Sequence, residues 1–174
     1  MGVSKKTMKK ILIVNGYPKS GKTEMELAIA RIKKSMIRSS IDCVKEISKE
    51  YFGWSGNEND KTETWREFFS ELKKFLVRKF DYIFLDISKT VQEFYRDVNA
   101  EILMIDSREP EEIERFKNCF QAITVFVQND RCEKITSNES DANVENYKYD
   151  YYIDNNSTLD DLEKKAIEFI KELN

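Results

Sequence analysis

A short loop near the start of the chain places two of its five glycines five positions apart. The segment ILIVNGYPKSGKTEMELAIA, residues 11–30, joins an apolar run to a helix-like run through this loop, and Lys22 and Thr23 follow the second glycine. Glycine leaves room for backbone N–H groups to converge on an anion, and a helix that begins there turns its N-terminus toward the same anion. The residue types and their spacing therefore predict a phosphate-binding loop.

The loop matches the pattern G-x-x-x-x-G-K-[ST] with a strand expected before it and a helix after it. In this pattern Lys22 supplies a mobile positive charge for the outer phosphates of a nucleotide, and the Thr23 hydroxyl can ligate Mg²⁺. We expect the whole loop to bind the nucleotide, namely Gly16, Tyr17, Pro18, Lys19, Ser20, Gly21, Lys22 and Thr23.

Several classes of protein share such a loop, and the rest of the sequence narrows the choice. The chain has no Asn-Lys-x-Asp segment of the kind with which GTPases recognise guanine, and 174 residues are few for a large ATPase. A small kinase fits a single domain of this length.

The composition limits the partners and the chemistry. The 29 basic and 32 acidic residues are mixed along the chain, so we expect no nucleic-acid partner. No apolar run approaches the roughly 20 residues that cross a bilayer, and residues 1–10 lack the apolar stretch of a signal peptide. There is no histidine, which excludes histidine-dependent triads and histidine-ligated metals. The three scattered cysteines predict no metal site or disulfide framework, and we expect a reducing cytoplasm.

Apolar runs and turn signals predict five strands. They lie in 9–16, in 43–48, in 100–106 up to Asp106, in 122–128, and as a short strand within 149–156. Residues 53–63 and 129–149 are polar and are expected to be loops.

Helices are expected between these strands. The first runs from Lys22 to about Arg38, with Leu27, Ala28, Ala30 and Ile32 facing inward. A second begins at Thr64 with a capping box to Glu67, and it carries the apolar stripe Trp65, Phe68, Phe69, Leu72 and Leu76. Pro110 opens another helix, and Thr158 caps the last one, whose apolar face is Leu159, Leu162, Ala166, Ile167, Phe169, Ile170 and Leu173.

The segment 81–88, DYIFLDIS, allows two interpretations. Alone it is typical of a strand, and Asp86 would then end the third strand and take the metal-binding role. The wider window has apolar residues at intervals of three and four, which favours one long amphipathic helix over 79–98. They are Phe80, Ile83, Phe84, Ile87, Val91, Phe94, Tyr95 and Val98. We prefer the helix, which leaves Asp106 as the acidic residue that ends the third strand.

The alternation of strands and helices predicts an α/β sandwich with a mainly parallel sheet and helices on both faces. No internal repeat or composition shift marks a second domain, so we expect one domain over residues 1–174.

A second segment, EILMIDSREPEEIERFK at residues 101–117, adds a resemblance to a known family to the evidence from the loop. The chain resembles the phage-type deoxynucleoside monophosphate kinases and their dephospho-coenzyme A kinase relatives, a group of P-loop kinases. Their Asp-x-Arg-x-Pro-x-Glu segment stands here as Asp106, Arg108, Pro110 and Glu112. Their C-terminal pattern is matched by Asp154, Asn155, Thr158, Leu159 and Leu162.

The resemblance implies a three-layer P-loop sandwich with sheet order 2-3-1-4-5, and ATP with Mg²⁺ as the phosphoryl donor system. It implies that Asp106 and Thr23 hold the metal, and that Arg108 contacts the acceptor or the transferring phosphate. It places the acceptor over an insert at about 49–98 and a lid at about 129–149, with Arg131 and Lys134 as its cations. We therefore expect Lys22, Asp106 and Arg108 to be the catalytic residues and Arg131 to contribute to nucleotide binding.

The predicted function is an ATP-dependent kinase that transfers the γ-phosphoryl group to a nucleoside monophosphate or a similar phosphorylated small molecule. Two alternatives remain open at this point. One is a nucleotide-binding module of the same fold with little or no kinase activity, and the other is a kinase for a coenzyme precursor.

Overall fold

The chain divides into two compact units. The computed structural model describes residues 9–132 and 144–173. One unit comprises Met1–Ile37 and Phe94–Asn174, and the other comprises Arg38–Glu93. The predicted lid cation Lys134 and much of the predicted lid lie outside the described residues.

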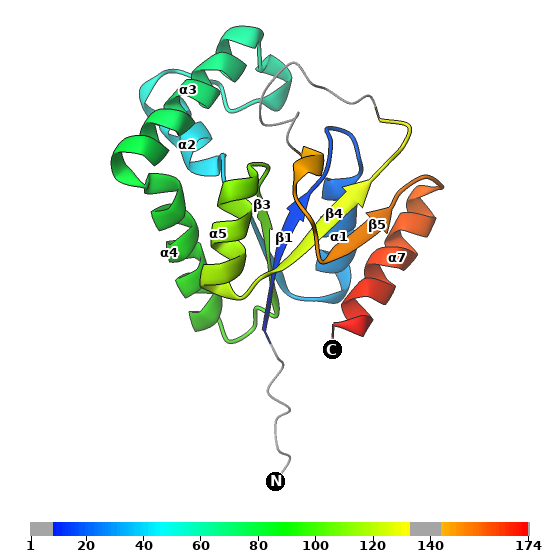
Figure 1. Cartoon of the computed structure of the whole chain (residues 1–174). Coiled ribbons are helices and arrows are strands. Elements are labelled where there is room, and N and C mark those ends of the chain that lie inside the picture. Colours follow the sequence, from blue (N-terminus) through cyan, green and yellow to red (C-terminus); the bar gives the residue numbers. More distant parts are fainter. Residues whose placement is uncertain (1–8, 133–143, 174) are drawn as a thin grey trace. The chain divides into compact units, whose positions relative to one another are not determined.

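Five strands form a single sheet in the order β2-β3-β1-β4-β5 (Figure 1). They are β1 (Lys10–Asn15), β2 (Ser35–Ser39), β3 (Ile102–Asp106), β4 (Ile123–Gln128) and β5 (Tyr151–Asp154). Strand β1 pairs in parallel with both β3 and β4, and β4 pairs in parallel with β5. This arrangement confirms the predicted α/β fold and its strand order.

Helices cover both faces of this sheet. Helices α1 (Lys22–Ile32) and α7 (Leu159–Glu172) lie on one face and α5 (Pro110–Phe120) lies on the other (Figure 1). On the α1 and α7 face, alternate strand residues such as Leu12 and Val14 form one core with Met25, Ile29 and Phe169. A short 3-10 turn, η2 (Val144–Asn146), precedes β5.

The ends of two helices agree with their sequence signals. Pro110 is the first residue of α5, and the Thr158 hydroxyl accepts a hydrogen bond from the Asp161 N–H at the start of α7. The predicted apolar face of α7 is wrong at Leu159, which is 63% exposed because it lies in the first turn, ahead of the buried Leu162.

The prediction was also wrong for the first helix and the second strand. Helix α1 ends at Ile32, and Leu27, Ala30 and Ile32 face outward while Met25, Ala28 and Ile29 are buried. The second strand is 35–39, which is half-exposed and has no continuous apolar run to mark it.

Residues 43–48, predicted as a strand, belong to helix α2 (Asp42–Tyr51). Cys43, Val44 and Ser48 are buried in α2. This spacing of one and four residues places them on one face of a helix, whereas a strand would send Cys43 and Val44 to opposite faces.

The unit Arg38–Glu93 is largely helical. After α2 come a 3-10 turn η1 (Glu58–Asp60), α3 (Glu63–Phe80) and α4 (Tyr82–Arg96), the last of which continues past the unit boundary. The helix preferred for 79–98 is confirmed, but it starts after a break at Asp81, whose backbone is left-handed. Phe80 therefore ends α3, and Val98 follows α4 and is 91% exposed.

The start of α3 corrects the predicted capping box. The cap is Thr62, whose hydroxyl accepts a hydrogen bond from the Trp65 N–H at 3.4 Å, and Thr64 lies inside the first turn. The two threonines are two residues apart, and the one that directly precedes the helix has the extended backbone that a cap requires.

Asp86 is part of an ion-pair network in this unit and does not end a strand. Its carboxylate accepts hydrogen bonds from Arg38 Nε at 3.1 Å and from Arg38 Nη2 at 2.8 Å. Arg38 also binds Glu46, and this hydrogen bond holds the pKa of Glu46 below its ordinary value. The Arg38 and Asp86 side chains are 19% and 17% exposed, so the pair is largely shielded from water.

We expect Asp86→Asn to lower the free energy of unfolding by about 1–3 kcal/mol, because the Arg38 guanidinium loses its best shielded anion. Urea unfolding followed by circular dichroism measures this change. Glu93→Gln is the matched control, since Glu93 lies exposed on the same helix. Equal stability of the two variants would contradict a structural role for Asp86.

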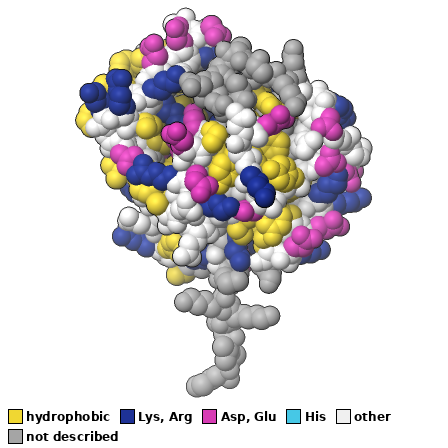
Figure 2. Space-filling view, viewed as in Figure 1, with side chains coloured by type: hydrophobic (Ala, Val, Ile, Leu, Met, Phe, Trp, Pro, Cys, Tyr) yellow, Lys and Arg dark blue, Asp and Glu magenta, His cyan; other side chains and the backbone are white. Residues whose placement is uncertain are grey.

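None of the helices within 9–132 and 144–173 is both long and apolar enough to span a membrane. On the face shown in Figure 2, basic and acidic side chains are interspersed, as the nearly balanced composition leads one to expect.

Candidate active site

The predicted phosphate-binding loop connects the end of β1 to the start of α1. Gly21 caps α1, and its carbonyl accepts the helix's first backbone hydrogen bond, from Met25 at 3.0 Å. The loop therefore lies at the carboxyl edge of a parallel sheet, where ligand crevices form in α/β folds.

Gly16 occupies a position that no larger residue fits. A Cβ added there would lie 2.6 Å from the Val127 carbonyl oxygen of β4 and 2.6 Å from the Ser20 hydroxyl oxygen. A backbone oxygen cannot move aside as the end of a side chain can, so the first glycine is fixed by close contact with the sheet.

The middle of the loop has the backbone conformation of an anion-binding concavity. Lys19 and Gly21 both have left-handed backbone, with φ of 64° and 99°. Left-handed residues that alternate with others turn successive N–H groups toward one point, and the first turn of a helix adds N–H groups that have no acceptor within the helix.

A buried hydroxyl lies inside this loop. Ser20 is 1% exposed, and in the part of the chain that the structure describes its hydroxyl oxygen has no hydrogen-bond partner. A buried polar atom without a partner is costly, and a bound anion beside the loop is one way to satisfy it.

Lys22 and Thr23, the last two residues of the loop, are also the first two residues of α1. The Lys22 ammonium donates a hydrogen bond to the Gly16 carbonyl at 3.0 Å, so its charge is held across the loop. Thr23 is exposed in the first helical turn. These positions fit the predicted contacts with outer phosphates and with Mg²⁺.

Asp106 and Arg108 come to the same edge of the sheet from β3. Asp106 is the last residue of β3 and is paired in register with Val14, two residues before Gly16. The Asn15 side-chain amide donates to the Arg108 backbone carbonyl at 3.5 Å. The structure thus brings both predicted catalytic residues beside the start of the loop. Glu112 accepts a hydrogen bond from the Ser107 hydroxyl at 2.5 Å.

Arg131 lies after β4 and contacts the loop between β5 and α7. Its Nη2 donates to the backbone carbonyls of Asn155 and Ser157 at 3.2 and 2.9 Å. The guanidinium therefore ties the segment after β4 to the segment after β5, at the same edge of the sheet as the phosphate-binding loop.

Two asparagines that sequence reasoning did not assign to the site support the loop. Asn155 donates from its side-chain amide to the Ser20 carbonyl at 2.8 Å, and a Cβ on Gly21 would lie 2.4 Å from the same amide nitrogen. The second glycine is thus required by its packing against Asn155 as well as by its backbone conformation.

Asn15 joins the other end of the loop to the segment before β5. Its side-chain oxygen accepts from the Gly16 N–H at 2.8 Å, and its amide donates to the Tyr149 hydroxyl at 2.7 Å. The Tyr149 hydroxyl in turn donates to the Val144 carbonyl at 2.9 Å, and burial raises its pKa above the ordinary value.

The one sequence signal for Asn15 was a polar residue at the end of an apolar strand. In the structure Asn15 is fully buried, and a buried side-chain amide requires hydrogen-bond partners. Asn155 was named only through the family resemblance. Nothing in the sequence pairs either residue with the loop, because the contacts join residues more than 130 positions apart.

Three features of the loop fit a nucleotide's phosphates: left-handed backbone at Lys19 and Gly21, a lysine held across the loop, and the N-terminus of α1. For the metal, Thr23 and Asp106 are the residues that would hold Mg²⁺. Within 9–132 and 144–173 no group of three or more Cys, Asp and Glu side chains is arranged to hold a metal. Mg²⁺ commonly uses only one or two protein ligands beside phosphate and water.

Comparison with known proteins agrees with this geometry at the level of the fold. Shikimate kinase from Bacteroides thetaiotaomicron is 16% identical, covers 94% of this chain and 98% of its own length, and gives a TM-score of 0.54. Dephospho-CoA kinase from Campylobacter jejuni is 16% identical over 95% of this chain and 98% of its own, with a TM-score of 0.53. A gluconokinase from Sinorhizobium meliloti is 12% identical over 97% and 95%, with a TM-score of 0.50.

No protein-family model and no curated protein sequence matches the chain. The similarity is therefore one of structure, and the fold is that of the P-loop kinases. These structural neighbours agree with the resemblance to P-loop kinases that the sequence predicts. They do not single out the phage-type deoxynucleoside monophosphate kinases.

Asn155→Ala should weaken both the fold and ATP binding. The Ser20 carbonyl loses its partner, which costs about 1–2 kcal/mol of stability, and the loop is less well ordered before the phosphates arrive. Thermal melts with and without ATP measure both effects. Asn156→Ala is the matched control, because the Asn156 amide binds the exposed Asp130. Equal melting temperatures and equal ATP-induced shifts for the two variants would contradict the role given to Asn155.

Proposed function

We propose that this protein is an ATP-dependent kinase that transfers the γ-phosphoryl group to a phosphorylated small molecule, a nucleoside monophosphate being the first candidate. The observation that carries the proposal is the convergence of the phosphate-binding loop, Asp106 and Arg108 at one edge of the sheet. A loop alone accounts for nucleotide binding, whereas transfer also needs a metal-binding carboxylate and a cation for the acceptor side.

Each residue has a distinct task in this proposal. Backbone N–H groups of residues 16–23 bind the phosphate oxygens, and the Lys22 ammonium neutralises the outer phosphates. Thr23 and Asp106 hold Mg²⁺, which when bound neutralises charge that develops on the transferring group. Arg131 supports the nucleotide side by holding the loop after β5.

Arg108 acts on the acceptor side. Its planar guanidinium presents paired N–H donors that match phosphate oxygens, and it neutralises charge as it spreads in the transition state. Phosphoryl transfer requires little covalent help from the protein, so positioning and charge neutralisation account for the chemistry, and the absence of histidine is no obstacle.

Two variants separate nucleotide binding from transfer. Lys22→Ala should strongly weaken ATP binding or turnover, because the outer phosphates lose their direct cation.

Arg108→Lys keeps the charge but loses the planar fork, so we expect ATP binding to be retained and acceptor phosphorylation to fall by at least about tenfold, roughly 1.4 kcal/mol. ADP release over a panel of acceptors with ATP and Mg²⁺ measures turnover, and calorimetry measures ATP affinity.

Lys164→Ala and Arg96→Lys are the matched controls, since both residues are exposed and neither is assigned to the site. ADP release with none of the acceptors, while ATP binds, would favour a nucleotide-binding module without transfer. Unchanged acceptor kinetics in Arg108→Lys would remove Arg108 from the mechanism.

A further inference from the structure

Asn15 ends a strand whose other residues on the same face are apolar. Ile11, Ile13 and Asn15 alternate with Leu12 and Val14, so these three lie on the face of β1 opposite to the core with α1 and α7. All three are 3% exposed or less. A buried amide is costly unless its hydrogen bonds are made, whereas leucine or isoleucine would fill the same space without that cost. The partners of the amide therefore show what asparagine does in this place.

Hydrogen bonds from the Asn15 side chain reach three segments of the described chain. Its oxygen accepts from the Gly16 N–H at 2.8 Å. Its nitrogen donates to the Tyr149 hydroxyl at 2.7 Å and to the Arg108 backbone carbonyl at 3.5 Å. An asparagine nitrogen carries two N–H donors, so both are used. The Gly16 N–H can only donate and the Arg108 carbonyl can only accept, which fixes the orientation of the amide.

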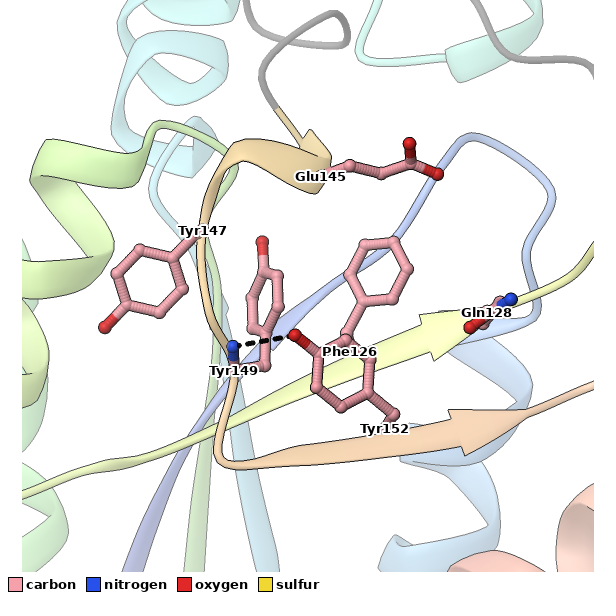
Figure 3. A pocket seen from close by; sticks show the side chains of 6 residues that line it. All are labelled: Phe126, Gln128, Glu145, Tyr147, Tyr149 and Tyr152. Atoms are coloured by element: carbon pink, nitrogen blue, oxygen red, sulfur yellow. Dashed lines mark hydrogen bonds between the residues drawn. The ribbon is translucent and has the colours of Figure 1, made fainter.

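Tyr149 is a firm anchor for this amide. Its hydroxyl donates to the Val144 carbonyl at 2.9 Å, and its backbone N–H donates to the Tyr152 hydroxyl at 3.1 Å, the bond drawn in Figure 3. Its ring is 4% exposed, and the centroids of this ring and the Phe126 ring are 5.0 Å apart. Phe126 is in turn paired in register with Asn15. The amide is thus held from the side of β4 and β5.

The Arg108 backbone lies just beyond the end of β3. Asp106, the last residue of β3, is in register with Val14, and the Ser107 hydroxyl donates to Glu112 of α5 at 2.5 Å. The bond from Asn15 then ties the Arg108 carbonyl to the end of β1. At 3.5 Å this bond is long, so it depends on the two shorter bonds that hold the Asn15 amide in place.

We propose that Asn15 is a positioning residue that sets the place of the Arg108 backbone relative to the phosphate-binding loop. The inference rests on the proposed kinase function, in which the loop holds the ATP phosphates and Arg108 acts on the acceptor. Transfer requires the two phosphate groups to meet in a fixed geometry, and a misplacement of about 1 Å can cost about a hundredfold in rate. The amide supplies this fixed relation because it bonds the first residue of the loop and the Arg108 carbonyl at once.

A double-mutant cycle tests this role. Asn15→Leu keeps a buried side chain of similar size and removes all three hydrogen bonds. We expect kcat, measured by ADP release with ATP, Mg²⁺ and a panel of nucleoside monophosphates, to fall at least about tenfold. Arg108→Lys should then add only about threefold or less, against at least about tenfold in the wild-type protein, because a misplaced arginine has less to lose. A merely structural role would leave the two losses multiplicative.

Tyr149→Phe is a milder variant, which keeps the ring and removes the partner of the Asn15 amide. Its kcat should fall about threefold or more, the effect of one weakened hydrogen bond. Tyr147→Phe is the matched control, because the Tyr147 hydroxyl donates to the exposed Glu114 at 2.6 Å and points away from Phe126 and Tyr152 in Figure 3. Its kcat should stay within about twofold of wild type.

An NMR comparison tests the link without turnover. The Glu109 N–H belongs to the same peptide group as the Arg108 carbonyl, so its chemical shift reports on the bond from Asn15. Tyr149→Phe should shift the amide signals of Gly16 and Glu109, and Tyr147→Phe should leave both in place. Circular dichroism shows which variants are folded, and Tyr149→Phe takes the place of Asn15→Leu in the cycle if the latter is not.

Three results would overturn the inference: multiplicative losses in the cycle, unchanged kcat in folded Asn15→Leu, or Gly16 and Glu109 signals that Tyr149→Phe does not move. Failure of the kinase function is a different result. If the wild-type protein releases no ADP with any acceptor, the kinase proposal falls, and the NMR comparison alone decides whether Asn15 links the loop to the Arg108 backbone.

Discussion

The site depends on one requirement: backbone N–H groups must approach a phosphate without side chains in the way. The two glycines are also required by the fold itself, because a Cβ on Gly16 would lie 2.6 Å from the Val127 carbonyl of β4 and a Cβ on Gly21 would lie 2.4 Å from the Asn155 amide nitrogen. The sheet positions the first glycine and the loop after β5 positions the second. The parallel order of the strands then brings Asp106 and Arg108 to the same edge.

Much of the fold could be predicted because the central strands are buried on both faces. β1, β3 and β4 are continuous apolar runs closed by a polar residue, and they were located correctly. The edge strand 35–39 is half-exposed and has no such run, so the first helix was extended through it and the strand was placed in α2. Short apolar segments do not distinguish a strand from one face of a helix.

The candidate site was predictable only where its residues are neighbours in sequence. The loop, and Asp106 and Arg108 at the end of β3, follow from local patterns, and the structure places them at one edge of the sheet. Asn15, Tyr149 and Asn155 hold the loop through contacts that span more than 130 residues, and no local pattern encodes such pairs.

The central claim is that the loop binds the phosphates of ATP. The most direct measurement is a ¹⁵N–¹H NMR titration with ATP and Mg²⁺, compared with adenosine at the same concentration. The account predicts large, saturable shifts of the Gly21, Lys22 and Thr23 amides with ATP and little change there with adenosine, because these N–H groups bind phosphate oxygens. Loop amides that do not respond to ATP, while saturable shifts arise elsewhere in the chain, would contradict it.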